Sequence, residues 1–153
     1  MSSDPKDIRN WLRLSERITT SGALANADPQ RLAGIGVERV INLALDDHED
    51  ALPEARALMA AAGLEYVHIP VSFDAPSQAD YHAFVTVLEA DEAPVHVHCI
   101  MNYRVSAFFY RWNRGCGMPE AEARRLIEAT WSPHEIDHPT VKPWRDFVRE
   151  VDK

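Results

Sequence analysis

Residues 95–112 read VHVHCIMNYRVSAFFYRW, and this stretch decides the fold. Val95–Val97 is typical of a short buried strand, and residues 107–112 are typical of the first turns of a helix. Cys99 therefore lies at a strand-to-helix junction, where unpaired backbone N–H groups converge and the helix dipole is positive. Such a junction binds oxyanions and favours the thiolate form of a cysteine. The stretch predicts an anion cradle with a nucleophile at its base.

Alternating strands and helices are expected around this junction. The other strands are predicted at residues 17–20, 37–43 and 66–71, and the other helices at residues 28–33, 54–62, 77–90, 119–130 and 139–151. Strands separated by helical segments indicate an α/β fold, with a mostly parallel central sheet flanked by helices. In such sheets ligands bind beyond the carboxyl ends of the strands, which is where Cys99 falls.

Composition limits the classes of function. The chain has 153 residues, 46% of them hydrophobic and 26% charged, as in an ordinary globular domain. A formal net charge of −8 disfavours nucleic acid as a partner. We expect no membrane partner, because no apolar run approaches a membrane span, and no signal peptide is recognisable. Two cysteines are too few for a disulfide framework, so we expect a cytoplasmic protein.

The run His98-Cys99, a short loop and Arg104 resembles the motif of the cysteine-dependent protein tyrosine and dual-specificity phosphatases. Four residues separate Cys99 from Arg104 where those enzymes usually have five, and Asn102 stands where they usually carry glycine. Asparagine tolerates the left-handed backbone that glycine adopts. The short loop resembles that of a bacterial branch related to the domain found beside some β-lactamase-like hydrolases. The resemblance covers residues 18–153, with residues 1–17 as a leader packed on this phosphatase-like domain.

The resemblance implies hydrolysis of phosphomonoesters through a phosphocysteine, with phosphotyrosine or dual-specificity substrates. Cys99 would attack phosphorus, and Arg104 would hold two phosphate oxygens through its planar fork. The phosphate-binding loop would comprise Ile100, Met101, Asn102, Tyr103 and Arg104. The partner would be a phosphorylated protein or a small-molecule phosphoester. No cofactor or metal is expected, and the sequence does not indicate an oligomeric state.

Further residues are assigned supporting roles. His98 is expected to orient the loop from the interior, and Ser106 either bonds the thiolate or bonds back into its own helix. Asp74 follows Phe73 just past a predicted strand and is the first candidate for the general acid. Asp80 is the second candidate, and residues 46–49 could border the same pocket.

Two alternative functions remain open, and a third motif is disfavoured. A loop of four residues is also used by rhodanese-type sulfurtransferases. The large side chains of Met101 and Tyr103 could instead leave a catalytically weak phosphate-binding module. His134-Glu135-Ile136-Asp137-His138 matches the HExxH zinc motif, but Pro139 follows at once. We therefore interpret Ser132-Pro133 as a helix cap and helix start instead.

Overall fold

One five-stranded sheet forms the centre of the protein, and a computed structural model describes it over residues 3–152. The strand order is β1-β2-β5-β3-β4. The strands are β1 (Leu12–Arg13), β2 (Ile18–Ser21), β3 (Arg39–Asn42), β4 (Glu65–His68) and β5 (Val95–His98). Strands β2, β5, β3 and β4 are parallel, and β1 pairs antiparallel with β2 at the edge. The expected mostly parallel sheet is confirmed.

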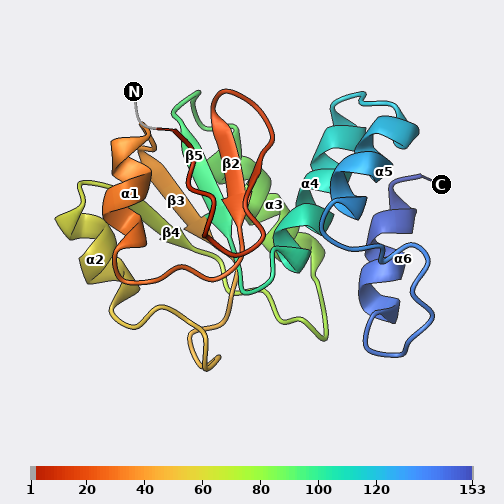
Figure 1. Ribbon diagram of the computed structural model, residues 1–153. Helices are drawn as coiled ribbons and strands as arrows, with labels where there is room; N and C mark the ends of the chain where they lie inside the picture. Colours follow the sequence, from red (N-terminus) through yellow and green to blue (C-terminus); the bar gives the residue numbers. More distant parts are fainter. Residues whose placement is uncertain (1–2, 153) are drawn as a thin grey trace.

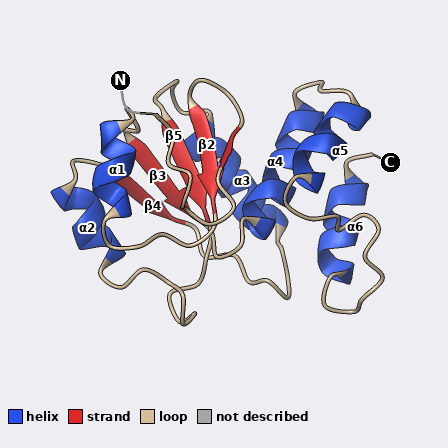
Figure 2. Cartoon of the chain, viewed as in Figure 1, coloured by secondary structure: helices blue, strands red, loops and turns tan. Residues whose placement is uncertain are grey.

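Helices cover both faces of this sheet, as Figures 1 and 2 show. Helices α1 and α2 lie on one side, and α3 and α4 lie on the other, with α5 and α6 packed beyond α4. The helices are α1 (Asp28–Gly34), α2 (Ala55–Ala61), α3 (Gln78–Leu88), α4 (Tyr103–Gly115), α5 (Glu120–Glu128) and α6 (Lys142–Glu150). This layered arrangement is the α/β architecture that the alternating pattern predicts.

Two apolar cores result, because successive strand residues face opposite sides of the sheet. Val95 and Val97 join the larger core, with Phe108 from α4 and Phe84 from α3. Val40 joins the smaller core beneath α1 and α2. The valines of β5 thus pack against the helices of the larger core, whereas His96 on the other face of the strand bonds to the side chains of Thr19 and Ser21.

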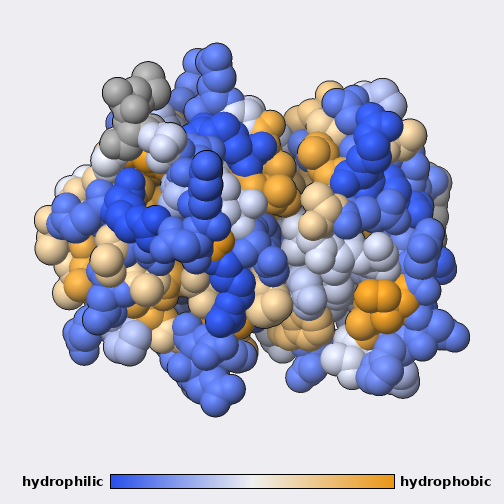
Figure 3. All heavy atoms as spheres, in the orientation of Figure 1, coloured by the Kyte–Doolittle hydropathy of each residue, from blue (hydrophilic) through white to orange (hydrophobic). Residues whose placement is uncertain are grey.

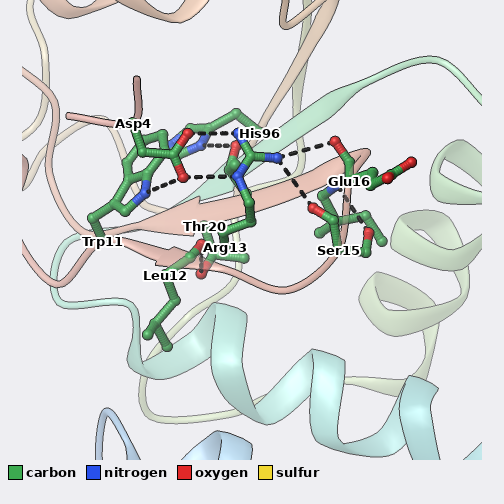
Figure 4. Close-up of polar contacts among 10 residues, drawn as sticks. Asp4, Trp11, Leu12, Arg13, Ser15, Glu16, Thr20 and His96 are labelled. Atoms are coloured by element: carbon green, nitrogen blue, oxygen red, sulfur yellow. Dashed lines mark hydrogen bonds and ion pairs between the residues drawn. The ribbon is translucent and has the colours of Figure 1, made fainter. Parts of the chain in front are cut away.

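The N-terminal segment packs against the sheet edge (Figure 4). Arg13 donates to both carboxylate oxygens of Asp4 at 2.6 and 2.7 Å, and the Trp11 indole donates to the same carboxylate at 3.3 Å. The Trp11 ring also stacks on buried His96, with ring centroids 5.0 Å apart. Residues 12–13 thereby form a fifth strand that the sequence pattern did not predict.

Several element boundaries differ from the expectations. The helix after Cys99 begins at Tyr103, four residues earlier than the apolar run at 107 suggested, so Arg104 lies within its first turn. The strand expected at 66–71 ends at His68, before Pro70. Residues 132–136 form only a turn, in which the Ser132 carbonyl accepts from two later amides, so the helix start expected there is wrong.

The surface is mixed in polarity. On the face shown in Figure 3, small hydrophobic patches are separated by hydrophilic residues. Among residues 3–152, Met101 is a large hydrophobic residue that is nevertheless exposed, with 37% of its surface accessible. Over residues 3–152, no helix has the length and apolar character needed to span a membrane.

Candidate active site

Cys99 lies directly after β5, between the parallel strands β2 and β3. Its amide donates to the Ser21 carbonyl at 3.4 Å, and the Leu43 amide donates to the His98 carbonyl at 2.8 Å. The carboxyl ends of three parallel strands therefore meet at this residue. Only 1% of the Cys99 surface is exposed.

The loop from Cys99 to Asn102 turns directly into α4. Asn102 has φ 67° and ψ 7°, the left-handed conformation that asparagine tolerates better than most residues. Its carbonyl accepts the first helical bond from the Ser106 amide at 2.9 Å. Tyr103 and Arg104 were expected in the loop, but they are the first residues of the helix. Asn102 thus performs the turn for which related loops use glycine.

The carbonyl groups of Ile100 and Met101 point toward the N-terminal part of the chain. The Ile100 carbonyl accepts from the Ala23 amide at 2.8 Å, and the Met101 carbonyl accepts from the Asn10 side chain at 2.8 Å. Because the carbonyl and the N–H of a planar trans peptide point in opposite directions, the N–H groups of these peptides face the other side. The Met101 and Asn102 N–H groups are therefore directed to the same side of the loop, an arrangement that suits an anion.

Gly22 permits the close approach of β2 to this loop. A Cβ atom on residue 22 would lie 2.4 Å from the Ile100 carbonyl oxygen, which is closer than such atoms can approach. The Gly22 amide also donates to the Arg9 carbonyl at 2.7 Å. No motif in the sequence indicates this contact between Gly22 and the cysteine loop.

Arg104 is buried beside the loop, with 6% of its surface exposed. One terminal nitrogen donates to the Val71 carbonyl at 2.9 Å, and the Phe73 ring lies 5.9 Å from the guanidinium carbon. Its Nε atom is buried without a hydrogen-bond partner, and no carboxylate pairs with it among residues 3–152. A buried cation without an anionic partner is unfavourable, so this geometry suits an incoming oxyanion.

His98 and Ser106 are both buried next to the two ends of the loop. Burial lowers the pKa of His98 to about 4, so its ring is neutral at pH 7, and its Nδ1 atom lies 3.4 Å from the Cys99 carbonyl oxygen. The Ser106 hydroxyl donates to the Tyr103 carbonyl at 3.0 Å and accepts from the Trp131 indole at 3.0 Å. Of the two roles considered for Ser106, the bond back into its own helix is therefore the one present.

The three candidate sources of a general acid lie in different surroundings. Asp74 is exposed, on the loop whose Val71 and Phe73 contact Arg104. Asp80 lies in the first turn of α3, and its amide donates to the capping hydroxyl of Ser77. Asp46, His48 and Glu49 line a hollow with residues of α2 and β4. Of these carboxylates, Asp74 is the one whose own loop touches the buried arginine.

An aromatic cluster holds the Asp74 loop beside the cradle. Tyr103 stacks on Trp131 at 4.5 Å between ring centroids, and Phe73 packs on both Trp131 and Trp144. The Trp144 indole also donates to the Phe73 carbonyl at 2.6 Å. The two tryptophans were missed because their position in the sequence carries no motif. The large Tyr103 side chain was a reason to expect a catalytically weak site. Its ring is stacked on Trp131 in this cluster.

The zinc motif at residues 134–138 is not presented by a helix. His134 is buried, whereas His138 is exposed and accepts from the Thr140 amide. His134 instead lies near Glu120 and Asp152, with potential ligand atoms within 4.8 Å of one another. Glu120 and Asp152 are each paired with an arginine at 2.7 Å, Arg124 and Arg114 respectively. Their charge is already neutralised, which disfavours a divalent cation between them.

Comparison with known proteins identifies the family. The family model described as the phosphatase-like domain of beta-lactamase hydrolase-like protein matches residues 10–113. The chain belongs to this family. The curated beta-lactamase hydrolase-like protein of Agrobacterium fabrum is 34% identical over 91 residues, which are 58% of this chain and 21% of that protein. The chain thus spans only a small part of this relative's length.

Solved structures share the fold of this phosphatase-like domain. A DUF442 protein of Shewanella putrefaciens is 30% identical, with a TM-score of 0.79, over 95% of this chain and 93% of its own. TpbA of Pseudomonas aeruginosa, crystallised with phosphotyrosine, has a TM-score of 0.70 at 21% identity, over 94% of this chain and 86% of its own. The fold is therefore that of the cysteine-dependent tyrosine and dual-specificity phosphatases.

Proposed function

We propose that the phosphatase-like domain hydrolyses phosphomonoesters with Cys99 as nucleophile. The observation that supports this most is Arg104, a buried guanidinium with a free Nε and no carboxylate partner in the described region, beside the cysteine loop. A phosphate would supply the missing negative charge and accept from Nε in a charge-assisted hydrogen bond. The amino end of α4 adds its dipole at the same place.

In the first step of the proposed reaction, the Cys99 thiolate attacks phosphorus, and the bond from phosphorus to the leaving oxygen breaks. The phosphoryl group is then bonded to the Cys99 sulfur. Backbone N–H groups of the loop and the Arg104 side chain stabilise the three equatorial oxygens, over which charge is spread in the transition state. His98 stays neutral and keeps the base of the loop in place.

Asp74 is the proposed general acid of this step. Its carboxylic acid donates a proton to the leaving oxygen, and the resulting carboxylate then accepts a proton from the water that attacks the phosphocysteine. That second attack releases phosphate and restores the Cys99 thiolate. The contacts of Val71 and Phe73 with Arg104 support this assignment, because they hold the Asp74 loop against the proposed phosphate site.

The proposed substrate class is a phosphorylated protein or a small-molecule phosphoester. Phosphotyrosine is the first substrate to assay, because it is the ligand crystallised with TpbA. Sulfur transfer and phosphate binding without turnover are the competing functions. Neither of them assigns a role to the exposed carboxylate of Asp74, whose loop contacts the buried arginine through Val71 and Phe73.

The two cysteines allow a matched experiment. Cys99→Ser should abolish hydrolysis of an aryl phosphate, because serine is a far weaker nucleophile than a thiolate, while vanadate binding persists. Cys116→Ser changes an exposed cysteine at the end of α4 and should hydrolyse the substrate at the wild-type rate. Turnover by Cys99→Ser at the wild-type rate would refute the proposed nucleophile.

A second assay separates the competing functions. Wild-type protein should hydrolyse aryl phosphate with inhibition by vanadate, and it should not form thiocyanate from thiosulfate and cyanide. Thiocyanate formation that depends on Cys99 would assign a sulfurtransferase instead. Vanadate binding without activity on either substrate would assign a phosphate-binding module.

A further inference from the structure

Arg9 and Asn10 of the N-terminal segment lie against the outer side of the cysteine loop. The Asn10 amide nitrogen donates to the Met101 carbonyl at 2.8 Å. The Arg9 guanidinium lies 3.4 Å from the Ile100 carbonyl oxygen and 3.2 Å from a carboxylate oxygen of Asp50. Two consecutive loop carbonyls are therefore bound by residues that are about 91 positions away in the chain.

The contact between Asn10 and the loop is reciprocal. The Asn102 side chain donates to the Asn10 carbonyl at 2.9 Å and to the Thr20 hydroxyl at 3.0 Å. Both asparagines have left-handed backbones, with φ of 51° at Asn10 and 67° at Asn102. Two uncommon backbone conformations thus face each other and are linked by two side-chain hydrogen bonds. Gly22 binds the same segment through its bond to the Arg9 carbonyl.

The geometry of the peptide group explains how these bonds orient the N–H groups of the loop. The Met101 carbonyl and the Asn102 N–H belong to one planar peptide and point in opposite directions. Holding the carbonyl outward therefore holds the N–H toward the interior of the cradle. Asn102 keeps a left-handed backbone, with φ of 67°, that is unfavourable for a residue other than glycine, so bonds from outside the loop help to hold this arrangement.

We infer that Asn10 is a positioning residue of the oxyanion site, so that the N-terminal segment is part of the active site. This inference rests on the proposed function, because it assumes that the loop binds a phosphate-like anion. Asn10 acts through the Met101–Asn102 peptide and does not touch the substrate. Losing its side chain should leave the fold intact and weaken the binding of tetrahedral and trigonal-bipyramidal oxyanions.

The test replaces Asn10 with glycine, which removes the amide and still accepts a positive φ. Asn26→Gly is the matched control, because Asn26 is exposed in the loop before α1. Dissociation constants for orthovanadate and the amide hydrogen exchange of residues 99–104 are measured for both variants and the wild type. Asn10→Gly should bind vanadate about 10-fold or more weakly, exchange faster at the loop and melt cooperatively. The control should match the wild type in all three measurements.

The outcomes distinguish this inference from the proposed function. Vanadate affinity equal to that of the wild type in Asn10→Gly would overturn the inference, even if the wild type is an active phosphatase. If the wild type binds no vanadate, the proposed function and the role of Asn10 in an oxyanion site both fail, and hydrogen exchange then tests only whether Asn10 holds the loop in place. Unchanged exchange at residues 99–104 would overturn that role, and faster exchange confined to them would support it.

Discussion

Replacement of Gly22 by alanine should damage the active site without touching a catalytic group. The added Cβ would lie 2.4 Å from the Ile100 carbonyl oxygen and 3.1 Å from its carbonyl carbon, whereas such contacts are not found below 3.0 Å. The obstacle is backbone, so no side chain can rotate away. Either β2 or the cysteine loop must therefore move by several tenths of an ångström.

The size of the effect follows from that displacement. Overpacking of this kind costs about 1–3 kcal/mol of unfolding free energy. A shift of the loop also weakens the 2.8 Å bond from the Ala23 amide to the Ile100 carbonyl, which fixes one peptide of the cradle. Since a misplacement of about 1 Å can reduce a rate by about 10²-fold, we expect kcat to fall by roughly 10- to 100-fold.

The assay compares Gly22→Ala with Gly34→Ala by thermal melting, aryl phosphate turnover and vanadate binding. Gly34 lies in α1, and a Cβ there would have no atom within 4 Å. Since alanine is favoured over glycine in a helix by about 1 kcal/mol, the control should be at least as stable as the wild type and equally active. A Gly22→Ala protein with wild-type kcat and vanadate affinity would refute the claim that close approach of β2 shapes the cradle.

Two further predictions concern proton transfer and acid stability. Asp74→Asn should slow an alkyl phosphate by roughly 10²–10⁴-fold and an activated aryl phosphate far less, because only a poor leaving group needs protonation. Asp80→Asn should leave both rates unchanged, and the opposite pattern would make Asp80 the acid. Burial lowers the pKa of both His98 and His134 to about 4, from 6.5. Between these values the unfolded chain binds more protons, so stability should fall as pH drops from 6.5 to 4, by about 3 kcal/mol for His98 and by less for His134. Urea unfolding of His134→Gln should show a shallower loss over this range, and an equal slope would contradict the assignment.

The fold class could be predicted because it depends on local patterns. Val95 and Val97 face one core and buried His96 faces the other side, as the alternation in β5 requires. The position of Cys99 beyond a central strand follows from the same pattern. The start of α4 was predicted late, because Tyr103 and Arg104 carry no helix-start signal and Asn102 caps the helix through its left-handed backbone rather than through its side chain.

The surroundings of the site could not be predicted, because they come from segments distant in the sequence. Asn10 meets Met101, Gly22 meets Ile100, and Trp144 meets Phe73 only after the chain has folded. Such contacts leave no periodicity and no fixed spacing, since their sequence separation depends on the loops between them.

The sequence by itself determined the parallel α/β layers and the placement of a cysteine and an arginine at one strand-to-helix junction. Both follow from side-chain periodicity and from backbone preferences that act over a few residues. The tertiary structure alone decided that the Arg104 guanidinium is buried with a free Nε, and that the loop carbonyls are bound from outside by Ala23 and Asn10. These features depend on hydrogen bonds and burial between distant segments, which exist only when the whole chain is packed.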